Sequence, residues 1–107
     1  MSRRARLNLT EVPQHIIQRG NNRQATFFAN EDYRFYLDRL LDASRKYQCS
    51  IYAYVLMTNH VHLLASSERS YGLSLMMQHV GRYFVRYINR VYSRSGTLWR
   101  DDSGQAW

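Results

Sequence analysis

Three residue types are scarce in this chain of 107 residues, which has one cysteine, one proline and a single lysine. Its one cysteine, Cys49, cannot form an internal disulfide, which favours a reducing compartment, so we expect a cytoplasmic location. No run of about 18 apolar residues occurs, so we expect no membrane-spanning helix. The basic N-terminus is not followed by an apolar stretch, which argues against a secretory signal.

The sequence also lacks repeats, low-complexity tracts and a recognisable linker, so we expect one domain over residues 1–107. Within it, residues 1–9 form a basic arm and residues 102–107 form an atypical tail. Apolar residues make up 45% of the chain and aromatic residues 14%, which is too rich a composition for a disordered protein.

The scarcity of lysine makes the charge unusual, because 14 of the 15 basic residues are arginine. The chain carries 8 acidic residues, and its net charge is +7. Arginine binds phosphate through a planar fork and stacks on bases. A small, basic, aromatic-rich domain is therefore expected to bind nucleic acid. On composition alone, the alternative is an ordinary basic protein in which arginine replaces lysine.

Local patterns predict an alternation of strands and helices. Only two residues separate two β-rich runs, which is hairpin length, and such a hairpin would pair Met57 with His60. Val55 would then pair with His62. The predicted elements are strands at 14–18, 49–57, 60–65 and from residue 97, and helices at 31–47 and 73–92. This order is that of the ferredoxin-like split βαβ fold, an α+β fold with an antiparallel sheet and helices on one face.

His60 and His62 flank one hydrophobic residue, Val61, inside a predicted strand. Side chains of a strand alternate between its faces, so both imidazoles point to the same side. Two neighbouring imidazoles can supply two ligands of a divalent metal ion, although a His-x-His pair alone is weakly specific. A third ligand would come from elsewhere. His15 and His79 are candidates, but an isolated histidine is more often a solvated or hydrogen-bonded side chain.

The segment from Tyr54 to Leu64 reads Tyr-Val-Leu-Met-Thr-Asn-His-Val-His-Leu-Leu. It resembles the H-U-H motif of single-tyrosine, IS200-like transposases, in which U is a bulky hydrophobic residue. Further stretches resemble the REP-associated tyrosine transposases in the same order, namely residues 18–24 with Phe27 and Phe28, residues 31–35, and residues 77–89 followed by 96–100. The resemblance covers about residues 10–101.

The resemblance implies a transposase that cleaves and rejoins hairpin-bearing, single-stranded DNA through a 5′-phosphotyrosine. In that family the two histidines hold a divalent ion, usually magnesium or manganese, which implies that His60 and His62 are metal ligands here. The ion polarises the scissile phosphate, whose negative charge grows in the transition state. The implied partners are single-stranded or hairpin DNA and no membrane, with the protein acting as a monomer or a homodimer.

The chain departs from the family after Trp99, where a helix that carries the nucleophilic tyrosine is expected. The remaining residues do not match it, so the catalytic residue is unknown, and the sequence suggests a truncated chain whose nucleophile lies beyond residue 107. Tyr83 and Tyr87 on the second predicted helix are interpreted as core or DNA-stacking residues. We therefore expect a DNA-binding transposase domain that is inactive alone. Two alternatives are a non-catalytic nucleic-acid-binding module and a small metal-binding protein.

Two polar clusters are the candidate DNA contacts. One is the loop after the first predicted strand, and the other is a cationic stripe at positions i, i+4 and i+8 of the second helix. Each has a simpler interpretation, as a solvated turn or a solvated helix face. The candidate DNA-binding residues are Arg19, Asn21, Asn22, Arg23, Arg82, Arg86 and Arg90.

Overall fold

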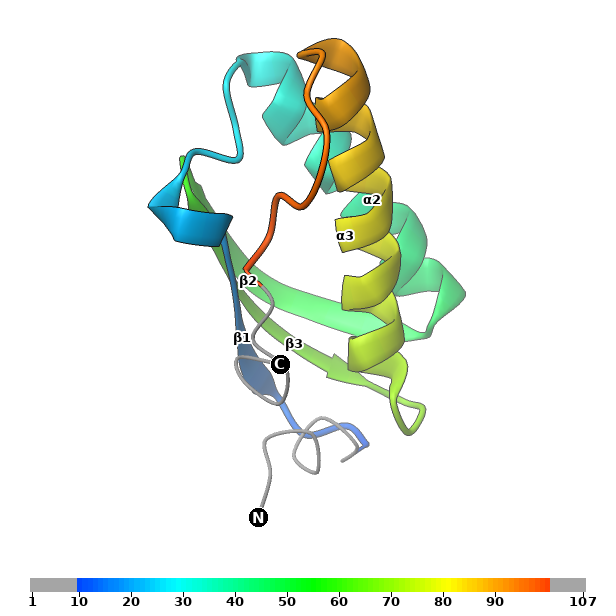
Figure 1. Cartoon of the computed structure of the whole chain (residues 1–107). Coiled ribbons are helices and arrows are strands. Elements are labelled where there is room, and N and C mark those ends of the chain that lie inside the picture. The colour runs from blue at the N-terminus through cyan, green and yellow to red at the C-terminus, as the bar shows by residue number, and fades with distance from the viewer. Residues whose placement is uncertain (1–9, 101–107) are drawn as a thin grey trace.

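Two long helices and a three-stranded antiparallel sheet make up the fold (Figure 1). The computed structural model describes residues 10–100, so the predicted basic arm at 1–9 and the tail at 102–107 lie outside the described residues. The elements are β1 (Gln14–Arg19), η1 (Asn21–Arg23), α2 (Asn30–Lys46), β2 (Cys49–Met57), β3 (His60–Ser67) and α3 (Gly72–Val91).

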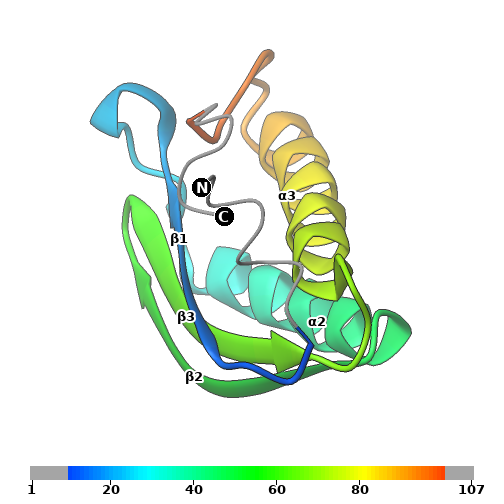
Figure 2. The same ribbon diagram turned by 90° about the horizontal axis from the view of Figure 1, so that it is seen from below.

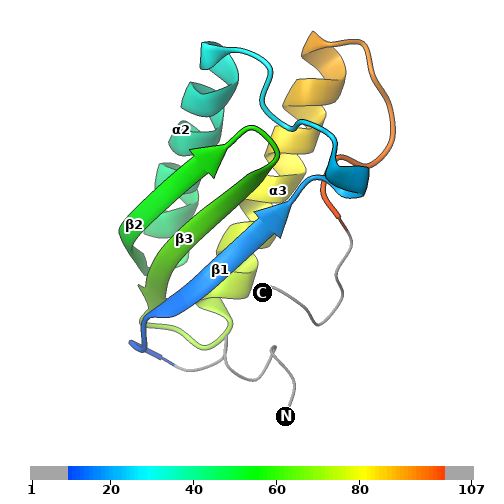
Figure 3. The same cartoon turned by 90° about the vertical axis from the view of Figure 1, so that its left-hand side faces the viewer.

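The strands are arranged in the order β1-β3-β2, and both neighbouring pairs are antiparallel. The helices α2 and α3 cover one face of the curved sheet, and the described residues leave its other face open (Figures 2 and 3). Strand, helix, hairpin and helix follow one another as expected for a ferredoxin-like split βαβ fold, so the predicted α+β class is confirmed. None of the described helices is long and apolar enough to cross a membrane.

The core lies between the sheet and the helices, because each element buries one face. The sheet contributes Ile16 from β1 and Val61 and Leu63 from β3, all of them buried. Phe84 is completely buried whereas Tyr83 is 40% exposed, which decides the side of α3 that faces the core. The buried apolar residues of the helices are Tyr36, Leu40 and Ala43 on α2 and Leu73, Met76, Met77, Val80, Phe84 and Ile88 on α3.

The hairpin of β2 and β3 has the register that its two-residue turn predicts. Met57 is the partner of His60, and Val55 is the partner of His62. Val61 is completely buried in the core. The histidines on either side of it therefore point to the open face of the sheet, because side chains alternate along a strand.

The strand expected from residue 97 is reduced, among the described residues, to a single bridge between Trp99 and Gly20. Beside it, the Arg100 N–H donates a hydrogen bond to the Arg19 carbonyl at 2.7 Å. Within the described residues, only the start of the predicted fourth strand is therefore observed, where it contacts the outer edge of β1. Any continuation of this strand would involve residues after 100, which lie outside the described residues.

Candidate functional site

Three histidines gather on the open face of the sheet. The rings of His60 and His62 have centroids 4.8 Å apart and are nearly perpendicular, at 74°. The ring of His15 on β1 lies beside that of His62 and nearly parallel to it, with centroids 5.2 Å apart and an angle of 13° between the rings. Arg19 is the partner of His60 across the two strands, so their side chains share a face. The structure therefore brings the two predicted ligands together and places a cation beside them.

Each histidine of the pair uses one ring nitrogen in a hydrogen bond. The Nδ1 atom of His60 lies 2.8 Å from the Oδ1 atom of Asn59. The Nδ1 atom of His62 lies 3.1 Å from the Nε2 atom of His15. Within residues 10–100, the Nε2 atoms of His60 and His62 have no such partner, and they are the nitrogens left for a ligand.

The surroundings of His62 favour its neutral form. Partial burial lowers the pKa of His62 below its usual value. Positive charge on His60, His15 and Arg19 lowers this pKa further. Only a neutral imidazole offers a lone pair to a metal ion. The lowered pKa of His62 thus favours the neutral ring that metal binding requires.

The donors suit a divalent ion that keeps open coordination positions. A histidine nitrogen lies about 2.0–2.1 Å from a bound zinc ion, so rings as close as those of His60 and His62 can share an ion of similar size. No group of three His, Cys, Asp or Glu side chains within the described range could hold a metal ion. An ion held by the pair would take further ligands from water, phosphate oxygens or amide groups. The pair therefore fits a divalent ion, and metal binding stays a prediction.

The two candidates for a third metal ligand have different surroundings. His15 contacts His62 directly on the open face. His79 lies on α3, where its ring contacts the rings of Tyr47 and Tyr83. Because α3 covers the opposite face of the sheet, the structure brings His15 to the pair and leaves His79 away from it.

A polar hollow of about 420 Å³, called the loop hollow below, lies at the end of β1 next to His60. Its lining joins the loop after β1 to the turn between β2 and β3. The lining residues are Arg19, Gly20, Asn21, Asn22, Arg23, Asn59, His60 and Arg100. All four loop residues predicted to bind DNA are among them, so this cluster adjoins His60.

Gly20 holds this loop close to the hairpin. A β-carbon at this position would collide with the Gln24 carbonyl oxygen and lie 2.9 Å from the Thr26 side chain. The Gly20 N–H donates to the Asn59 carbonyl at 2.8 Å. Asn22 then has a left-handed φ of 53°, a conformation that asparagine tolerates. The Gly-Asn-Asn sequence therefore suits a tight turn whose polar side chains line the loop hollow.

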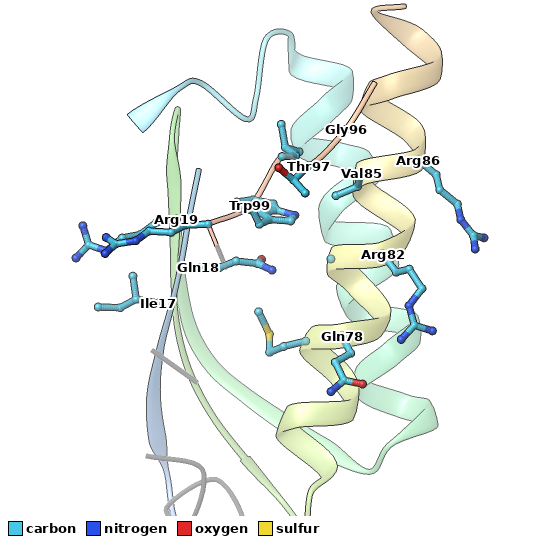
Figure 4. Close-up of a pocket in the computed structure, with 14 residues that line it drawn as sticks. Ile17, Gln18, Arg19, Gln78, Arg82, Val85, Arg86, Gly96, Thr97 and Trp99 are labelled. Atoms are coloured by element: carbon cyan, nitrogen blue, oxygen red, sulfur yellow. The ribbon is translucent and has the colours of Figure 1, made fainter. Parts of the chain in front are cut away.

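A second cavity, of about 520 Å³, lies between β1, α3 and residues 96–100 and is called the β1–α3 cavity below (Figure 4). Gln18 and Trp99 lie on its sheet side, and Arg82 and Arg86 stand on α3. The indole nitrogen of Trp99 is buried and has no hydrogen-bond partner among the described residues.

The two hollows are neighbours, because Arg19 and Arg100 line both of them. Figure 4 shows the Arg19 side chain pointing away from α3. The predicted helix stripe is exposed along its length, but only Arg82 and Arg86 reach the β1–α3 cavity, and Arg90 lines neither hollow. The structure therefore joins most of the predicted DNA-binding residues into one region and leaves Arg90 outside it.

The tyrosines near the end of α3 are engaged away from the histidine face. The hydroxyls of Tyr87 and Tyr92 each donate to a different carboxylate oxygen of Asp32, both at 2.8 Å. Burial, together with the hydrogen bond to Asp32, raises the pKa of Tyr87 to about 12. Attack on a phosphate requires the opposite shift, because the phenolate is the nucleophile. These contacts agree with the interpretation of Tyr87 as a packing residue.

Sequence reasoning missed two residues of this region. Asn59 bonds to His60, and its place in the two-residue turn just before that histidine could have indicated the contact. Arg100 lines both hollows, and the strand predicted from residue 97 could have indicated its place in the sheet, although not which strand it would contact.

One solved structure similar to this chain is that of a REP-associated tyrosine transposase bound to a REP hairpin. The two have 14% sequence identity and a TM-score of 0.69, and the match covers 88% of this chain and 54% of that chain. This chain thus spans about half the length of that relative, and at this identity the likeness shows a shared fold. No curated protein sequence matches the chain.

The amino-acid sequence itself matches a protein family over residues 8–104, nearly its whole length. That family is described as transposase, IS200-like. The match includes both histidines, the loop after β1 and the arginine stripe of α3. The chain therefore belongs to the IS200-like transposase family.

Proposed function

We propose that this domain binds hairpin-bearing single-stranded DNA, with a divalent ion at His60 and His62 and a DNA phosphate beside that ion. One observation carries the proposal. The two histidines share the open face of the sheet with Arg19, and His60 borders the arginine-lined loop hollow. A place for an ion and a place for a phosphate are thus adjacent.

The chain's own groups at this place have separate tasks. His60 and His62 supply two nitrogen ligands, and the proposed ion is magnesium or manganese. Such an ion supplies Lewis-acid stabilisation of the negative charge on a phosphate oxygen. Arg19 adds a permanent positive charge on the same face. The described residues leave this face uncovered, so a DNA strand has access to it.

The proposed path of the DNA follows the arginine residues. In the loop hollow Arg19, Asn21, Asn22 and Arg23 would contact phosphates and bases near the ion. Arg82 and Arg86 at the β1–α3 cavity would contact the adjoining part of the strand, and Arg90 would continue the stripe. The net charge of +7 favours such binding. The REP-associated transposase with the same fold is bound to a hairpin, which supports a hairpin-bearing ligand.

We expect this domain to bind DNA without forming a phosphotyrosine by itself. All nine tyrosines lie between residues 33 and 92, and no described contact joins any of their rings to His60 or His62. Tyr87 and Tyr92 are bonded to Asp32. The nucleophile would then come from a segment outside these 107 residues.

One experiment separates binding from covalent chemistry. The purified protein is mixed with a labelled, hairpin-bearing single strand and manganese. One half is read by fluorescence anisotropy, and the other half is run on a denaturing gel. We expect DNA binding that weakens as the salt concentration rises and that manganese strengthens. We expect no covalent protein–DNA band. A covalent band would refute the expectation that this domain forms no phosphotyrosine by itself. A Tyr87→Phe variant would then show whether Tyr87 is the nucleophile.

The same experiment discriminates the other classes of function. DNA binding that is indifferent to manganese favours a non-catalytic nucleic-acid-binding module. Manganese binding without any affinity for the hairpin favours a small metal-binding protein. A duplex of equal length without a hairpin serves as the control ligand, because it carries the phosphate charge and lacks the unpaired bases.

A further inference from the structure

Two side chains beside the histidine pair determine which ring nitrogens are free. We propose that His15 and Asn59 are positioning residues that hold His62 and His60 in the tautomer whose Nε2 atom can bind a divalent ion. The inference rests on the proposed metal site and adds to it the residues that orient the ligands.

The contact with Asn59 decides the tautomer of His60. The Oδ1 atom of an asparagine can only accept a hydrogen bond. It lies 2.8 Å from Nδ1 of His60, so with the amide in this orientation Nδ1 carries the proton and donates it. A neutral imidazole has a single N–H group. The Nε2 atom of His60 therefore keeps its lone pair for a ligand.

The contact with His15 has two directions, and only one of them is compatible with an ion at His62. If the Nε2 atom of His15 donated, His62 would carry its proton on its own Nε2 atom and could not bind an ion there. If Nδ1 of His62 donates, its Nε2 atom is free. An ion at His62 thus selects His15 as the acceptor. His15 then accepts the Nδ1 proton of His62, just as Asn59 accepts the Nδ1 proton of His60.

Both positioning residues are held in place by other contacts. The ring of His15 lies at 13° to the ring of His62, and the two strands that carry these rings, β1 and β3, are paired along their whole common length. The carbonyl of Asn59 accepts a hydrogen bond from the Gly20 N–H, which fixes the turn. Metal-binding histidines usually donate their second N–H to such an acceptor, and this orients the ring.

The test uses manganese alone as the ligand and four variants in two matched pairs. His15→Phe keeps an aromatic ring at this position but removes the acceptor, whereas His15→Gln keeps an acceptor. Asn59→Leu removes the acceptor of His60, and Asn59→Asp keeps one. Manganese affinity is measured by electron paramagnetic resonance. The histidine tautomers of the metal-free protein are read from long-range 15N–1H NMR.

We expect the wild-type protein to show the N–H of both His60 and His62 on Nδ1. His15→Phe should move the His62 proton towards Nε2 and weaken manganese binding about tenfold. His15→Gln should restore most of that affinity. Asn59→Leu should likewise move the His60 proton towards Nε2 and weaken manganese binding. Asn59→Asp should restore most of that affinity. A purely structural role would change stability without moving a tautomer, and circular dichroism verifies that each variant folds.

Two results would overturn the inference while leaving the proposed metal site intact. One is an unchanged tautomer and an unchanged manganese affinity in His15→Phe. The other is a loss in His15→Gln as complete as in His62→Ala, which would make His15 a ligand itself. Unchanged manganese affinity in His62→Ala would instead overturn the proposed site, and the inference with it.

Discussion

At the scale of single residues, Asp32 links the two helices. Its carboxylate is completely buried and accepts hydrogen bonds from the backbone N–H groups of Phe28 and Ala29, at 2.8 and 3.0 Å. It also accepts from the hydroxyls of Tyr87 and Tyr92. One carboxylate therefore caps the N-terminus of α2 and holds the C-terminal end of α3.

Replacing Asp32 with alanine should lower the free energy of unfolding by about 3 kcal/mol, because several donors lose a charged acceptor. Urea unfolding followed by circular dichroism measures this change. Asp38→Ala is the matched control, since Asp38 is exposed on the same helix. Its effect should stay within about 0.5 kcal/mol. Equal effects of the two variants would show that the Asp32 contacts contribute nothing.

The hydroxyl of Tyr87 predicts a pH dependence of stability. Its pKa is raised from 10.0 to about 12 in the folded protein. A raised pKa means that the protonated phenol stabilises the folded state fully below pH 10, and that this contribution is lost as the pH rises through 12. The difference in unfolding free energy between wild type and Tyr87→Phe should therefore shrink from about pH 9 to pH 12. A difference that is constant over this pH range would contradict the raised pKa of Tyr87.

The acidic start of α2 could be read from the sequence, but only as favourable charge at a helix N-terminus. The partners Tyr87 and Tyr92 lie 55 and 60 residues further along the chain. No local pattern reports such a contact, because it depends on how the two helices pack. The same holds for the contact of His15 with His62, which requires β1 to pair with β3.

At the scale of elements, the hairpin was the most predictable part of the fold. A two-residue turn and alternating burial define its register, and the partners of His60 and His62 follow from that register alone. The predicted fourth strand is tested only at its start, because the residues after 100 lie outside the described residues. Within the described residues only Trp99 forms a bridge there.

The loop after β1 depends on the absence of a side chain at Gly20. Gly20→Ala should push the loop away from the hairpin and weaken DNA binding, since a β-carbon has no room beside Gln24 and Thr26. Fluorescence anisotropy with the hairpin ligand measures the loss. Ser70→Ala is the control, because Ser70 is exposed and lines neither hollow. If Gly20→Ala binds DNA as the wild type does, the close approach at Gly20 is not needed for the loop to bind DNA.

At the scale of the whole molecule, the fold joins two arginine clusters that the sequence keeps some 60 residues apart. The loop cluster and the helix stripe were each predicted separately, and their adjacency follows from the packing of α3 beside β1. Arg19 and Arg100 line both hollows and connect them. Sequence patterns could identify the clusters but could not show that they adjoin each other or that His60 borders the first.

This arrangement predicts a graded salt dependence of DNA binding. Each phosphate contact with a single strand contributes about 0.7 to the slope of log affinity against log salt concentration. Arg86→Gln should lower the slope by about that amount, whereas Arg90→Gln should lower it less, because Arg90 lines neither hollow. Anisotropy titrations at several salt concentrations give both slopes. A larger effect at Arg90 would place the DNA path elsewhere on α3.

The central claim is that His60 and His62 bind a divalent ion at the place where the DNA phosphate binds. The most direct test is the affinity for hairpin-bearing DNA with and without manganese, compared between the wild type and a His60→Ala, His62→Ala double variant. We predict that manganese strengthens DNA binding by the wild type and has no effect on the double variant. An equal effect of manganese on both proteins would contradict the claim.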